Sequence, residues 1–154
     1  MLQETQTDEL HELSGALVTY AGRLVRAVSR RTTRQVPAAT LRLLSQLDEL
    51  GPIGVSHLAE ADRCSQPTMS SAVKHLIDKG WALKRPHPAD ARASLVELTG
   101  EGRDVLTDAR RRNAEAVAEL LRADEGHTLD DLRAAVALMK HLLEPHLTES
   151  RDHT

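Results

Sequence analysis

Aromatic side chains are almost absent from this chain of 154 residues, which has one tryptophan, one tyrosine and no phenylalanine. A hydrophobic core must therefore be built mainly from leucine, valine, alanine and methionine. A core of this kind favours helices over a β-sandwich or a β-barrel. The composition thus predicts a mainly helical protein.

Cysteine and long apolar segments are also scarce. Cys64 is the only cysteine, so a disulfide within the chain and a two-cysteine metal-binding motif are both excluded. No apolar run approaches the ~18 residues that span a bilayer. The first residues are acidic and lack the basic and then apolar order of a signal peptide. We therefore expect a cytoplasmic protein that does not bind a membrane.

The net charge of −3 conceals an uneven distribution along the chain. Residues 21–47 contain six arginines and no acidic residue, whereas residues 1–20 contain four acidic residues and no lysine or arginine. Residues 99–154 contain eight basic and twelve acidic residues. The average charge argues against a nucleic-acid partner, but this distribution leaves room for a cationic face in the first two thirds of the chain.

Apolar residues recur at steps of three and four near both ends of the chain. This spacing predicts a helix over residues 8–30, a long helix that Thr99 caps, and a last helix from Leu129 to near Pro145. Pro37 suits the start of a further helix in the first half of the chain.

The middle of the chain has the pattern of two helices joined by a short turn. A helix over residues 55–61 leads into the turn, and Ser65 then caps a helix over residues 66–79 that ends at Gly80. The second helix carries small polar residues at its N-terminal end. Such residues can reach base edges in a DNA major groove, so the pattern indicates a helix-turn-helix.

A hairpin follows this helix pair. Residues 82–85 and 95–98 are predicted to form two short strands around a turn-rich tip. Arg92 lies in the tip, where an arginine can enter the negative potential of a minor groove. A hairpin of this kind is what the wing of a winged helix requires.

These elements resemble the MarR family of bacterial transcription regulators across nearly the whole chain. The wing residues Asp90 and Arg92, followed by Leu98-Thr99 and Gly102, are the most specific part of the resemblance. The other matching residues are Leu58-Ala59-Glu60, Ser65-Gln66-Pro67-Thr68-Met69-Ser70, Leu76 and Lys79-Gly80.

The resemblance implies a mainly α fold with a small two- or three-stranded β wing. In that fold, a winged helix-turn-helix DNA-binding domain, residues 36–98, is flanked by helical dimerisation regions, residues 8–30 and 99–147. It further implies a homodimeric, ligand-responsive repressor that binds a pseudo-palindromic double-stranded DNA operator and associates with the bacterial nucleoid. Its two recognition helices would lie about one DNA turn apart, roughly 34 Å. No cofactor is implied.

The same resemblance implies specific site residues. The expected DNA contacts are Ser65, Gln66, Pro67, Thr68, Ser70, Ser71, Lys74, His75 and Arg92. Lys84 and Arg85 in the first strand of the wing are further candidates for phosphate contacts. The expected contacts to a small-molecule effector are His11, Tyr20, Arg23, Leu41 and Leu44.

The chain departs from the family pattern at two positions. Ala91 stands where the family often has a second arginine, which weakens the expected wing contact. Arg63 stands in the turn where the family often has glycine, so an altered or strained turn is expected there.

Two alternative functions remain open from the sequence. A winged helix can serve as a protein-interaction module without binding DNA, and a regulator can sense oxidants or metals. Cys64 has the position of a small core residue, which argues against a redox role. His141 and His146, with Glu144 between them, are spaced to lie on different helix faces, so no metal site is expected.

Catalytic motifs offer no further alternative. The sequence contains no Gly-rich phosphate loop, no nucleophile elbow and no His-Glu-x-x-His motif. We therefore do not expect an enzyme.

Overall fold

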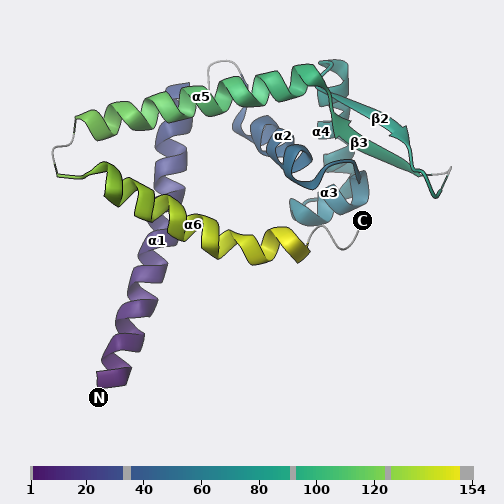
Figure 1. The fold of residues 1–154 in the computed structure, drawn as a ribbon. Coiled ribbons are helices and arrows are strands. Elements are labelled where there is room, and N and C mark those ends of the chain that lie inside the picture. Colours follow the sequence, from purple (N-terminus) through teal and green to yellow (C-terminus); the bar gives the residue numbers. More distant parts are fainter. Residues whose placement is uncertain (1, 33–35, 91–92, 124–125, 150–154) are drawn as a thin grey trace.

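The computed structural model describes the backbone of residues 2–32, 36–90, 93–123 and 126–149, and within these ranges the side chains from residue 6 to residue 143. The predicted fold class, mainly helical with a small sheet, is confirmed. The elements of the described part are α1 (Leu2–Thr32), α2 (Ala38–Leu50), β1 (Ile53–Gly54), α3 (Val55–Ala61), α4 (Gln66–Asp78), β2 (Ala82–Pro86), β3 (Ser94–Leu98), α5 (Gly100–Arg122) and α6 (Leu129–Glu149) (Figure 1).

The elements divide into a winged unit and long helices that extend from it. In Figure 1, α2, α3, α4 and the β2–β3 hairpin gather near the N-terminal end of α5, and the N-terminal half of α1 leads away from them. The helix α1 packs against α5. In the part of the chain that the structure describes, no helix combines the length and the apolar character needed to cross a bilayer.

The sheet is antiparallel and has the strand order β1-β3-β2. The two predicted strands pair with each other, and Ala82 lies opposite Leu98. The third strand, β1, has two residues, which pair with Leu95 and Val96. A strand this short carries no periodicity in the sequence, so its position could not be predicted.

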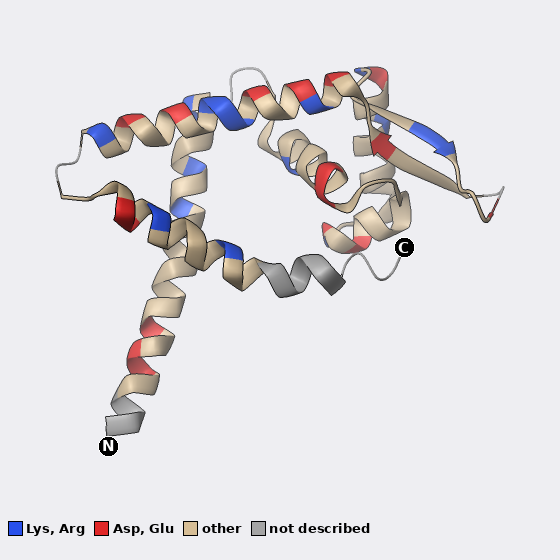
Figure 2. Cartoon of the chain, viewed as in Figure 1, with Lys and Arg blue, Asp and Glu red and all other residues tan. Residues whose placement is uncertain are grey.

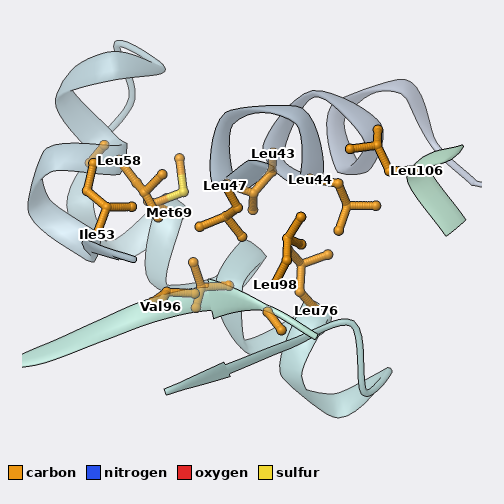
Figure 3. Close-up of a cluster of buried hydrophobic side chains, with 13 residues drawn as sticks. Leu43, Leu44, Leu47, Ile53, Leu58, Met69, Leu76, Val96, Leu98 and Leu106 are labelled. Carbon is orange, nitrogen blue, oxygen red and sulfur yellow. The ribbon is translucent and has the colours of Figure 1, made fainter. Parts of the chain in front are cut away.

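The core of the winged unit is aliphatic, as the composition requires. Leu44, Leu58 and Val96 are completely buried, and they come from α2, α3 and β3. Figure 3 shows the leucines of α2 facing Met69 and Leu76 of α4 and the inner side of β3. These elements therefore bury their apolar faces within one copy of the chain.

The long helices bury much less of their apolar surface. Val28 of α1 and Ala109 and Ala116 of α5 are buried, and Thr32 Oγ1 donates a hydrogen bond to Asn113 Oδ1 at 2.9 Å. Along the rest of α1 and along α6, however, large apolar side chains remain exposed. They are Leu10, Leu13, Val18, Tyr20, Leu24, Val25, Leu129, Leu132, Val136, Leu138, Met139, Leu142 and Leu143.

The start of α5 is tied to the start of β2 by a contact that only glycine permits. Thr99 caps α5 as predicted, since its Oγ1 accepts a hydrogen bond from the Gly102 N–H at 3.1 Å and donates one to the Gly80 carbonyl at 2.6 Å. A Cβ atom at Gly102 would lie 2.0 Å from the Trp81 carbonyl oxygen. The Leu-Thr-x-x-Gly motif is therefore structural in this chain.

We expect Gly102→Ala to lower the free energy of unfolding by about 1–3 kcal/mol, because the added methyl group forces helix and strand apart. Urea denaturation followed by circular dichroism measures this. Gly100→Ala is the matched control, because nothing lies within 4 Å of a Cβ there. Equal free energies of unfolding in the two variants would show that the close approach of Gly102 to Trp81 does not affect stability.

Candidate nucleic-acid interface

The helix α4 separates an apolar face from a polar face, as its sequence predicts. Met69, Val73 and Leu76 are buried in the core of the winged unit. The opposite face is exposed and carries Gln66, Thr68, Ser70, Ser71, Lys74 and His75. All six were expected as DNA contacts, and all six are exposed on α4.

The first turn of α4 is held by its own side chains. Ser65 is the N-cap, and its Oγ accepts a hydrogen bond from the Thr68 N–H at 3.3 Å and lies 2.8 Å from Thr68 Oγ1. Pro67 occupies the first turn, where it breaks no helical hydrogen bond. Ser65, Pro67 and Thr68 therefore give the exposed N-terminal end of α4 a defined shape.

The exposed side chains of α4 differ in how they are engaged. Ser71 Oγ donates a hydrogen bond to the Pro67 carbonyl at 3.0 Å, and Lys74 Nζ forms an ion pair with Asp78 at 2.8 Å. Within the described residues, by contrast, Gln66, Ser70 and His75 have no side-chain hydrogen bond. Of these three, Gln66 and Ser70 line the groove toward the wing.

A groove of about 620 Å³ runs between α4 and the wing. Gln66 and Ser70 line it from α4, Lys84 and His87 line it from the hairpin, and His57 lines it from α3. Neither His57 nor His87 was predicted from the sequence to belong to the site. They belong to elements separate from α4, so no spacing rule links them to it.

The strand β2 directs its two cations to different places. Lys84 lines the groove, whereas Arg85 Nε pairs with Glu97 Oε2 on the neighbouring strand at 3.2 Å. The alternation of side chains along a strand explains this separation of adjacent residues. Figure 2 shows this basic stretch of β2 next to the acidic position on β3. Arg92 and Ala91 lie outside the described residues, so the expected wing contact stays a prediction.

Arg63, in the turn before α4, is the one non-glycine residue among the described residues that has a left-handed backbone. Arg63 has a φ of 51°, a conformation that glycine adopts without strain. The departure from the family pattern at this position thus has the expected physical consequence. Cys64, the next residue, is half-buried and packs against the core, in agreement with a small core residue.

An ion pair fastens the same turn to α2. Arg42 Nε donates to Asp62 Oδ1 at 2.7 Å and Arg42 Nη2 donates to Asp62 Oδ2 at 3.0 Å, while Gln46 Nε2 lies 3.3 Å from Oδ1. These hydrogen bonds, those from Arg42 foremost, hold the pKa of the Asp62 carboxyl below its ordinary value. Asp62 is therefore ionised at neutral pH.

The five residues expected to bind an effector lie on α1 and α2 and differ in exposure. His11, Tyr20 and Arg23 are exposed along α1, where the Arg23 guanidinium lies 5.4 Å from the centre of the Tyr20 ring. Leu41 is half-buried on α2, and Leu44 has no exposed surface because it lies in the core. An effector could not contact Leu44 without opening that core. An effector site at these five residues stays a prediction.

A separate hollow of about 500 Å³ lies between the winged unit and α5. Trp81 and Val105 supply apolar surface, and His75, Lys79 and Arg112 supply cationic or titratable groups. Val36, Pro37 and Asp108 complete its lining. This set was not predictable from the sequence, because its members come from three separate segments.

The chain is similar to known regulators in sequence and in fold. A family model described as the MarR family matches residues 36–94. An HTH-type transcriptional regulator of Mycobacterium bovis is 31% identical over 115 residues, which cover 75% of this chain and 80% of that protein. The solved structure of Rv1404 from Mycobacterium tuberculosis is 27% identical and has a TM-score of 0.68, covering 86% of this chain and 92% of its own. A multiple antibiotic resistance repressor has a TM-score of 0.71 at 20% identity, covering 85% of this chain and 94% of its own.

We expect Arg63→Gly to raise the free energy of unfolding by about 0.5–1 kcal/mol, because glycine removes the left-handed strain at a modest entropic cost. Thermal and urea denaturation measure the change. Arg110→Gly, the same substitution inside an exposed helix, should instead destabilise by about 1 kcal/mol or more. A loss of stability in both variants would contradict strain at Arg63.

Proposed function

This chain belongs to the MarR family of transcriptional regulators, and we propose that it acts as a homodimeric, ligand-responsive repressor at a pseudo-palindromic operator. The observation that carries the proposal is the polar face of α4 beside the groove toward the wing. A helix with free hydrogen-bonding groups next to a basic strand suits the bases and phosphates of duplex DNA.

In this proposal α4 enters the major groove with its N-terminal end first. Gln66 and Ser70 contact base edges, because their side chains have no internal partner within the described residues. Lys84 contacts a phosphate from the wing, and Arg92 enters the minor groove. The remaining expected contacts position the helix on the sugar–phosphate backbone of the DNA. They are Ser65, Pro67, Thr68, Ser71, Lys74 and His75.

The histidines of the groove join this set of contacts. His57 and His87 lie on opposite elements that border α4. The His87 Nδ1 accepts a hydrogen bond from the Ala89 N–H at 3.1 Å, which leaves Nε2 as the nitrogen for a phosphate oxygen. We therefore propose that His57 and His87 both contact phosphates of the DNA.

The exposed apolar faces of α1 and α6 support a homodimer. Leu13 is 61% exposed and Val18 is 74% exposed, and the apolar residues of α6 are exposed along its described length. Contiguous apolar surface of this extent marks an interface in a protein that is stable in water. We assign dimerisation to residues 8–30 and 99–147, and DNA binding to residues 36–98. A two-fold dimer would present two copies of α4 to the two halves of an operator.

The ligand response is proposed for the region between the winged unit and the long helices. The hollow gives a small effector the apolar surface of Trp81 and the cation of Lys79, while Arg112 is paired with Asp108 in its lining. It adjoins α4 through His75, so an effector there would favour one orientation of the recognition helix. The effect on DNA affinity is limited by the effector's differential affinity for the two orientations. We place this regulator in the bacterial cytoplasm, at the nucleoid.

We expect Gln66→Ala to weaken binding to an inverted-repeat duplex by roughly tenfold and to leave the salt dependence unchanged, because it removes a base contact. Lys84→Ala should lower the slope of log K against log salt by about 0.9, the signature of one lost phosphate contact. Fluorescence anisotropy titrations between low and physiological salt measure both, on duplexes from the region upstream of the encoding gene. Arg92→Ala should weaken binding as well.

Arg133→Ala, which removes a cation from an exposed part of α6, is the matched control for these variants. Wild-type protein that binds no duplex at low salt would overturn the proposal. A protein-interaction module would then be the better assignment.

We expect Leu13→Glu and Leu142→Glu each to shift the chain from dimer to monomer, because each places a charge in the apolar contact. Sedimentation velocity at micromolar concentration measures the shift. Leu83→Glu is the same substitution at an exposed leucine of β2, outside the region assigned to dimerisation, and should leave the dimer intact. A wild-type chain that sediments as a monomer would contradict the proposed assembly.

A further inference from the structure

The ion pair between Arg42 and Asp62 is built differently from the other exposed ion pairs of the described chain. Both oxygens of the carboxylate are engaged by one guanidinium, and Gln46 adds a third hydrogen bond. The Asp62 side chain is only 16% exposed, whereas that of Arg42 is 60% exposed. A bidentate pair on a largely buried carboxylate has the defined geometry that most surface ion pairs lack.

Gln46 is a second residue of α2 that contacts Asp62. The Gln46 Nε2 lies within hydrogen-bond distance of the carboxylate, while Gln46 Oε1 is buried and has no partner among the described residues. Two side chains of α2, Arg42 and Gln46, therefore contact the Asp62 carboxylate in the turn.

Asp62 lies at the point where the chain turns from α3 into α4. Its N–H bonds to the Leu58 carbonyl at 3.0 Å and ends α3, and the Cys64 N–H bonds back to Ala59 at 2.9 Å. Arg63 between them has the strained left-handed backbone, and Ser65 already caps α4. A carboxylate three residues before the cap of α4 thus holds the segment that sets the direction of this helix.

The other partner, α2, connects this turn to the interior of the molecule. Its leucines fill the core of the winged unit, and Pro37 at its start lines the hollow next to α5. Arg42 is therefore a fixed link between a rigid element and the turn. Its position on the winged unit also suggests a simpler role, in which an exposed arginine contacts a DNA phosphate directly.

We propose that Arg42 is a positioning residue for operator recognition, which holds the turn before α4 through Asp62 and does not contact DNA. The inference rests on the proposed DNA-binding function. The two roles of Arg42 differ in their consequences. A phosphate contact depends on the charge of Arg42 alone, and Asp62 would only oppose it. A positioning role requires both partners of the pair.

The test compares Arg42→Ala and Asp62→Asn on a duplex that wild-type protein selects from a randomised pool. We expect each variant to weaken specific binding by roughly tenfold with no change in the salt slope. Asp62→Asn is decisive, because it removes a negative charge and so should tighten binding if charge alone mattered. Arg42→Lys, which keeps the charge but not the bidentate geometry, should bind with intermediate affinity.

Arg110→Ala and Asp48→Asn are the matched controls. They remove an exposed arginine–aspartate pair of 2.9 Å that joins α5 to α2 away from the turn. Both should bind the duplex as wild type does. A slope that falls by about 0.9 in Arg42→Ala, tighter binding by Asp62→Asn, or wild-type affinity in both would each overturn the positioning role.

A measurement without DNA separates failure of this inference from failure of the proposed function. Hydrogen exchange followed by mass spectrometry should show faster exchange over residues 62–68 in Arg42→Ala and in Asp62→Asn than in the two controls. Circular dichroism should show that all four variants are folded. Unchanged exchange in folded variants would overturn the inference even if the wild-type chain binds DNA. Faster exchange in a chain that selects no duplex would support the link while refuting the proposed function.

Discussion

The burial of the leucine face of α2 against α4 and β3 is the interaction on which the described structure depends. Leu44, Leu76 and Val96 are almost completely excluded from water, and each such side chain contributes about 1.5–3 kcal/mol to folding. Because Met69, Val73 and Leu76 must face this core, the opposite side of α4 is exposed by geometry. The polar surface that we assign to DNA is therefore a consequence of how the core is filled.

The apolar faces of α1 and α6, by contrast, are not covered by the core of the winged unit. The core of the winged unit is closed within one chain, but the long helices expose apolar side chains along much of their described length. In the described part of one chain these faces stay exposed, because α1 packs on α5 near its C-terminal end, where Val28 is buried and Thr32 bonds to Asn113. A second copy is the simplest cover, and it would also place the two recognition helices at a fixed separation. In the proposed dimer, assembly and DNA recognition would be linked through α5, which begins at Gly100 beside the wing.

Much of the fold was predictable because its signals are local. The cap residues Ser65 and Thr99, the apolar stripe of α4 and the two strands of the hairpin all depend on neighbours within a few residues. The two-residue strand β1 was not predictable, because it exists only through its pairing with β3. Leu44, one of the expected effector residues, shows the same limit of local signals. Leu44 has helical spacing like Leu41, but only packing assigns it to the core.

The candidate site also has features that the sequence predicts and features that only the tertiary structure shows. The sequence by itself determined a helical fold, a helix-turn-helix with a polar outward face and the family to which the chain belongs, since these follow from periodicity, caps and short motifs. Tertiary structure decided that His57 and His87 share a groove with Gln66, that Arg85 pairs with Glu97, and that Arg42 meets Asp62. These relations join segments far apart in the chain, and their positions are set by the packing of a common core that no local pattern encodes.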